Sequence, residues 1–165
     1  MWWRMEHLKG PITTGISFGL TSGVITTLGL MVGLHSGTHS VIAVIGGVIT
    51  IAIADALSDA LGIHISEEAK NTQTPKQIWV STIITFLTKF FVALSFVIPI
   101  LIFELGKAII ISVGWGISIV AILSYQLARR QGVTPAKVIA EHLGLTVAVI
   151  ALTHFVGDWV SFTFG

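Results

Sequence analysis

The amino-acid sequence predicts an all-α integral membrane protein with five transmembrane helices. Of the 165 residues, 53% are hydrophobic and only 10% are charged, and the mean hydropathy is +0.91. This composition lies well outside the balance of a soluble domain. Crossing a bilayer takes about 20 helical residues. The segments that meet this length are 12–34, 40–64, 78–103, 108–128 and 137–162.

The connections between these segments are short, so we expect one five-span domain over residues 1–165 and no soluble domain. The start, Met1 to Arg4, leads into the first span without a small-residue cleavage site, and we expect this span to be retained. An odd number of spans cannot complete an inverted-repeat pore within one chain, so a symmetric pore needs a homodimer.

The first span carries glycines at a regular spacing. Gly15, Gly19 and Gly23 follow one another every four residues, which lets membrane helices approach closely. We expect this stripe to pack against the second span, which carries Gly46 and Gly47, or against the first span of a second copy.

Hydroxyl groups also follow the first span at an unusual density. They either bond back to the carbonyl groups of their own helix or line a water-filled path. The candidate pore-lining residues are Thr21, Ser22, Gly23 and Thr26.

The second span contains two aspartates, Asp55 and Asp59, inside an otherwise apolar run. A carboxylate in hydrocarbon costs from about 3 to more than 10 kcal/mol, so it must face protein, water or a cation. Four residues make about one helical turn, which leaves the two side chains on one face, roughly 6 Å apart along the axis. One divalent cation can therefore touch both carboxylates.

The third span introduces a basic residue, Lys89, at about the depth of Asp55. Either the two form an ion pair, or Lys89 acts as an internal cation that releases Asp55 when metal or protons arrive. Pro99 comes late in this span, where a kink is tolerated, and Pro135 introduces the fifth span as a first-turn proline.

The fifth span contributes further ionisable groups. Glu141 and His142 lie at about the depth of Asp59, where they either join it in an oxygen-rich site suited to Fe²⁺ or Mn²⁺, or belong to the wet end of the helix. His154 and Asp158 are four residues apart and either orient a helix end or bind a ligand. Lys89, His142, His154 and Asp158 are the candidate ion-pair or proton-relay residues.

Two further acidic residues, Glu67 and Glu68, follow the second span. They either guide a cation toward Asp59 or form a solvated acidic turn. The candidate metal ligands are therefore Asp55, Asp59, Glu141, Glu67 and Glu68. The chain has no cysteine, which excludes disulfides and thiolate chemistry, so any metal must meet oxygen or imidazole.

Basic residues gather on one side of the predicted bundle. One side carries Arg4, Lys9, Lys70, Lys76, Arg129, Arg130 and Lys137. The connection on the other side carries Lys107. Because basic loops remain in the cytoplasm, we expect a cytoplasmic N-terminus and an outer C-terminus.

The first two spans resemble those of the vacuolar iron transporter family. The similarity rests on Gly19-Leu20-Thr21-Ser22-Gly23-Val24-Ile25-Thr26-Thr27 and on Ala54-Asp55-Ala56-Leu57-Ser58-Asp59. All five spans match in order. The resemblance implies a five-span homodimer with a cytoplasmic N-terminus that moves Fe²⁺ or Mn²⁺ out of the cytoplasm in exchange for protons.

The chain differs from the family pattern in the positions of its carboxylates. The family's Asn-Asp-Gly step in span one is here Thr21-Ser22-Gly23, and in span two Asp55 replaces a methionine and Asp59 a glutamate. Residues 66–77 replace the long glutamate-rich cytoplasmic helices of plant and fungal-type members. The resemblance thus implies a compact, divergent relative, in a prokaryotic plasma membrane.

The leading hypothesis is a homodimeric Fe²⁺ or Mn²⁺ exporter with proton counterflow. Asp55 and Asp59 would bind the cation, Ser22 would line the pore, and Glu141 would assist or relay protons. The metal is substrate, no cofactor or nucleic acid is expected, and the protein is not expected to be an enzyme.

Two alternatives remain. One is a non-transporting scaffold whose polar residues only specify helix packing. The other is a membrane enzyme that holds Mg²⁺ between Asp55 and Asp59 against a lipid-linked phosphate, although the additional aspartates and Gly/Ala-Arg signature of such enzymes are absent near Asp55.

Overall fold

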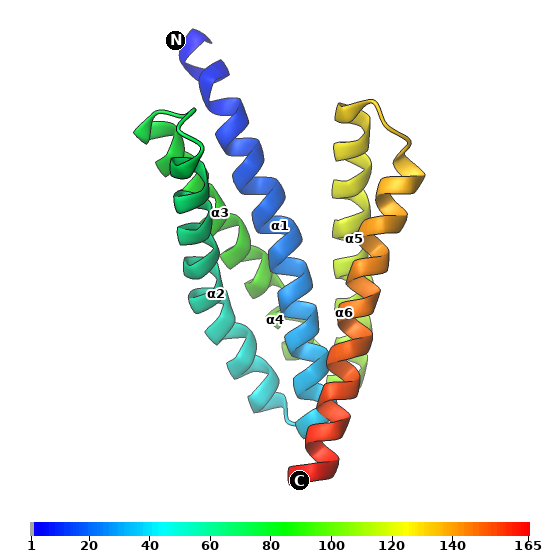
Figure 1. The fold of residues 1–165 in the computed structure, drawn as a ribbon. Helices are drawn as coiled ribbons and strands as arrows, with labels where there is room; N and C mark the ends of the chain where they lie inside the picture. The colour runs from blue at the N-terminus through cyan, green and yellow to red at the C-terminus, as the bar shows by residue number, and fades with distance from the viewer. Residues whose placement is uncertain (1) are drawn as a thin grey trace.

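The computed structural model describes the backbone of residues 2–165 and the side chains of residues 8–165, so Met1 and the side chain of Arg4 lie outside the described part. Over this range the regular structure is α-helix (Figure 1). The helices are α1 (Trp2–Thr38), α2 (Val41–Ala69), α3 (Pro75–Ser95), α4 (Val97–Ile102), α5 (Leu105–Gln131) and α6 (Pro135–Phe164).

Within residues 2–165, five helical segments are long and apolar enough to cross a membrane, which confirms the predicted fold class. They are Leu8–Thr38, Val41–Ala69, Pro75–Ile102, Leu105–Gln131 and Pro135–Phe164. The N- and C-termini lie at opposite ends of the bundle (Figure 1). Which end faces the cytoplasm stays a prediction.

Helices α3 and α4 together form the third span. The break lies at Phe96, whose backbone N–H bonds to the carbonyl oxygens of Ala93 and Leu94. Pro99 has no N–H to donate to the carbonyl four residues earlier, so the α-helical ladder cannot run unbroken through this point. The third span thus tolerates a break next to Pro99, and Pro135 opens α6 as the expected first-turn proline.

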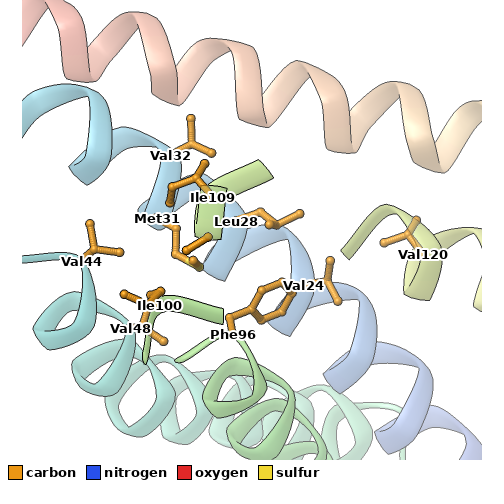
Figure 2. Packing of buried hydrophobic residues seen from close by; sticks show 11 residues of the cluster. Val24, Leu28, Met31, Val32, Val44, Val48, Phe96, Ile100, Ile109 and Val120 are labelled. Carbon is orange, nitrogen blue, oxygen red and sulfur yellow. The ribbon is translucent and has the colours of Figure 1, made fainter. Parts of the chain in front are cut away.

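Helix α1 is the central element and packs against α2, α3, α5 and α6. Its buried face contributes to an apolar cluster between the helices (Figure 2). The cluster includes Val24, Leu28 and Met31 of α1, Val44 and Val48 of α2, Phe96, Ile100 of α4, and Ile109 and Val120 of α5. Toward the N-terminal end, α5 and α6 diverge from α1, α2 and α3 (Figure 1).

The glycine stripe of α1 packs against α3, so the expectation that it packs against the second span was wrong. A Cβ added at Gly19 would lie 2.9 Å from the carbonyl oxygen of Thr85, and one at Gly23 would lie 3.3 Å from Cγ of Lys89. The stripe is buried within the chain and is not available to a second copy. Small-residue spacing predicts a close helix approach but does not specify the partner helix.

A second close approach joins α1 to α6. A Cβ at Gly157 would collide with the carbonyl oxygen of Gly33 and lie 3.0 Å from the backbone nitrogen of Gly37. Gly144, on the same helix, has no atom within 4 Å of its Cβ position. The contact between α1 and α6 thus depends on the absence of a side chain at position 157.

We predict that Gly157→Ala destabilises the fold by about 1–3 kcal/mol, since the added methyl must push two backbones apart. Gly144→Ala is the matched control, because it adds the same methyl group to α6 in open space. Thermal unfolding of both variants in detergent micelles measures the effect. Equal melting temperatures for the two variants would contradict the packing described.

Candidate ion site within the helix bundle

The ammonium group of Lys89 lies at the centre of a charged cluster between three helices. Lys89 is 1% exposed, and its Nζ lies 2.6 Å from Oδ2 of Asp55 and also contacts Oδ2 of Asp59. Nζ donates a further hydrogen bond, 2.9 Å long, to Oγ of Ser22. The ion pair expected as one alternative for Asp55 is therefore present, and it extends to Asp59.

Ser22 completes the cluster from α1. Its hydroxyl donates a 2.5 Å hydrogen bond to Oδ2 of Asp59 while it accepts from Lys89. The cluster thus combines one side chain of α1, two of α2 and one of α3. Because Gly23 is next to Ser22 and lies against the Lys89 stem, the lysine chain can pass between α1 and α3.

Small side chains bring α2 close enough for short aspartates to reach Lys89. Ala52, Ala56 and Ala60 recur every four residues and are buried against the bundle. Asp55 and Asp59 lie one residue before Ala56 and Ala60, at the flank of this buried face. The sequence therefore fixes both the close approach and the position of the two carboxylates.

The site carries an uncompensated negative charge. Two carboxylates face one ammonium group, so one formal charge remains when all three groups are ionised. The Asp55 and Asp59 side chains are 28% and 22% exposed, so both keep an accessible edge. Oδ2 of Asp55 is buried at ion-pair distance from Lys89 but receives no well-aligned hydrogen bond from the described residues. Such a site attracts a second cation.

The other predicted metal ligands do not join this cluster. Glu67 is 3% exposed and is held by Lys70, at 2.7 Å, and by Gln73, so it orders the α2–α3 connection rather than meeting a free cation. Glu68, its neighbour, is exposed. Among the described side chains, no three His, Asp or Glu residues gather closely enough to hold a metal.

Glu141 and His142 are also separate from Asp59, contrary to the first of the two alternatives for them. The Glu141 side chain is exposed and lies 4.0 Å from Lys137. His142 Nδ1 lies 2.8 Å from Oγ of Ser124 on α5. Equal depth did not bring these groups together, because α5 and α6 diverge from α2 and α3 at this end (Figure 1).

The hydroxyl groups of α1 divide into two classes. Thr21 and Thr26 each donate a 2.9 Å hydrogen bond to a carbonyl four residues earlier, as expected for membrane helices. Ser22 instead points toward the charged cluster. Ser22 and Gly23 therefore touch the ion site, whereas Thr21 and Thr26 bond to their own helix.

His154 links α6 to α1 near the far end of the bundle. Its Nδ1 contacts Oγ of Ser36, and its Nε2 lies 3.5 Å from Oδ2 of Asp158. His35 and His39 flank Ser36 in the sequence, and the centroids of their rings are 5.3 Å apart. His154 and Asp158 are thus paired as expected, and their role stays a prediction.

His64 was not predicted from the sequence as a polar contact. Its Nδ1 lies 3.0 Å from Oγ1 of Thr82, and its ring makes a T-shaped contact with the Trp79 ring at a centroid distance of 4.7 Å. It joins α2 to α3 beyond the charged cluster. Its place five residues after Asp59, within an apolar helix, was the available signal.

These features define a helical membrane protein with an ionic cluster buried between three of its helices. Comparison with models of known protein families gave no match, and comparisons with curated proteins and with solved structures gave none either. The resemblance to the vacuolar iron transporter family therefore stays a prediction.

We predict that Lys89→Met destabilises the protein by about 3–5 kcal/mol, since it leaves two adjacent carboxylates without their cation. Adding Asp55→Asn and Asp59→Asn to this variant removes the uncompensated charge and should recover most of the loss. Apparent melting temperatures in detergent at pH 7 compare the single and triple variants. A triple variant no more stable than Lys89→Met would rule out an electrostatic origin.

Proposed function

We propose that the protein is a homodimeric transporter that exports a divalent cation, Fe²⁺ or Mn²⁺, from the cytoplasm in exchange for protons. The observation that carries the proposal is the convergence of Asp55 and Asp59 on Lys89 in the interior of a membrane bundle. We place the protein in a prokaryotic plasma membrane, with the N-terminus in the cytoplasm.

The energetics of the cluster support a functional role. Replacing a buried ion pair by well-packed apolar groups is often neutral or stabilising, so helix packing alone does not require these charges. Ionisable groups inside membrane proteins commonly mark the path of an ion. The residual negative charge and the accessible edges of Asp55 and Asp59 favour a cation as the species that the site serves.

The donor set suits a hard or borderline cation. Carboxylate and hydroxyl oxygens are preferred by Mg²⁺, Ca²⁺ and Mn²⁺, and the cluster offers no soft ligand. Asp55, Asp59 and Ser22 together present fewer oxygens than the roughly six that such cations take, which leaves positions for water or for a second copy. In the proposed homodimer, a second copy would supply ligands at these positions.

Lys89 weakens cation binding, so that a bound cation can leave the site. When no metal is present, its ammonium group neutralises much of the carboxylate charge and prevents mutual repulsion of Asp55 and Asp59. When a divalent cation binds, the ammonium group must move away from the carboxylates. The repulsion between the ammonium group and the cation weakens binding. Transport needs affinity that is sufficient for entry but low enough for exit.

Ligand chemistry supports the proton exchange in this proposal. Carboxylates bind metal in their deprotonated form, so protons and metal compete for Asp55 and Asp59. The family resemblance points to the same coupling and the same metals, although the carboxylate of span one is replaced here by Ser22.

A scaffold role is the second candidate, and one observation favours it. Lys89 already holds both carboxylates within the chain, as a purely structural helix clamp would. In that case no cation passes, and the cluster only fixes the positions of α1, α2 and α3.

We predict that proteoliposomes containing the wild-type protein take up or release Fe²⁺ and Mn²⁺, and that Asp55→Asn/Asp59→Asn lowers this flux at least tenfold. The reason is that amides retain the shape but not the charge that attracts the cation. Flux is followed with a metal-sensitive dye inside the vesicles, with a proton gradient imposed across the membrane.

Glu104→Gln is the control, because Glu104 is exposed in the α4–α5 connection and pairs with Lys107 at 3.1 Å. Undiminished flux in the double variant would refute the transport site. A wild-type protein that moves no metal would favour the scaffold.

A further inference from the structure

A small cleft separates α1 from α5 near the end of the bundle that carries the N-terminus. Its volume is about 90 Å³, and it lies apart from the charged cluster. The polar lining comprises Thr13, Ser17, Gln126 and Arg130, and the apolar lining comprises Ile16, Leu123 and Leu127. Both helices therefore contribute polar and apolar side chains, and the lining combines hydrogen-bond donors and a positive charge with hydrocarbon.

The hydroxyl groups in this cleft differ from those deeper in the same helix. Thr21 and Thr26 bond back to carbonyl oxygens of α1. Within the described part of the chain, the hydroxyls of Thr13 and Ser17 make no such hydrogen bond and stay free to donate. Gln126 and Arg130, facing them from α5, also have no partner among the described residues.

Charge at this end of the bundle favours an anion. Arg130 lies in the last turn of α5 beside Arg129, and Lys137 follows at the start of α6. A guanidinium group forms paired, charge-assisted hydrogen bonds with phosphate oxygens. Basic pockets between transmembrane helices, at the depth of the lipid headgroups, are suited to anionic headgroups.

We propose that this cleft binds an anionic phospholipid. The Arg130 guanidinium and the hydroxyls of Thr13 and Ser17 hold the phosphate, Gln126 donates to a headgroup oxygen, and an acyl chain follows Ile16 and Leu123. The apolar side chains of the lining distinguish a lipid from free phosphate, which has no group to place against them. The bound lipid also fills the opening between α1 and the diverging α5.

The experiment uses native mass spectrometry of the full chain in detergent, with phosphatidylglycerol and phosphatidylcholine of identical acyl chains added in turn. The wild type should retain phosphatidylglycerol, with at least fivefold weaker retention of phosphatidylcholine. Arg130→Gln should lower phosphatidylglycerol retention about tenfold, as expected for loss of a charge-assisted phosphate contact.

Arg129→Gln is the matched control. Arg129 occupies the same last turn of α5 and is also exposed, but it does not line the cleft. A general effect of charge at the helix end would weaken both variants alike, and that result would overturn the proposal. So would equal retention of the two lipids by the wild type.

Two further measurements keep the test decisive. Thr13→Val/Ser17→Ala removes the hydroxyls without changing charge and should lower phosphatidylglycerol retention several-fold, which covers the case in which Arg130→Gln fails to fold. Inorganic phosphate should not displace the lipid at matched concentration, and displacement would indicate a free-phosphate site instead. None of these outcomes depends on metal transport.

Discussion

The ion cluster around Lys89 is the interaction on which the arrangement of α1, α2 and α3 depends. A lysine that is 1% exposed inside a membrane bundle is tolerable only because carboxylate groups meet its ammonium group. Asp55, Asp59 and Ser22 supply those contacts from two other helices. Loss of the register between these helices would leave a charge unpaired, so the cluster sets that register while it also forms the candidate site.

Packing by small residues makes this cluster possible. The glycines of α1 allow α3 to approach closely. The buried alanines of α2 allow α2 to approach α1 and α3. Helices α5 and α6 contact α1 mainly toward the C-terminal end of the bundle. They diverge from α1 toward the N-terminal end (Figure 1). The divergence separates the deep ion site from the basic cleft beside Arg130, so the two can be tested independently.

Sequence reasoning predicted the properties that depend on position along one helix. Hydropathy predicted the five spans, and the four-residue spacing predicted that Asp55 and Asp59 lie on one face. Their similar depth indicated an ion pair between Lys89 and Asp55 as one of two alternatives. It did not predict which helices are neighbours. Glu141 has the depth of Asp59 but lies on a helix that diverges from α2. Lateral arrangement depends on side-chain packing between helices, which no single-helix pattern contains.

The direct test of the central claim is the position of a bound cation relative to Lys89. Crystals grown with Mn²⁺ and measured for anomalous scattering would locate the metal. We predict a peak at coordination distance, roughly 2.0–2.6 Å, from both the Asp55 and Asp59 carboxylates, with the Lys89 ammonium group displaced. A structure in which Lys89 still bridges both carboxylates at saturating Mn²⁺, with no peak between them, would contradict it.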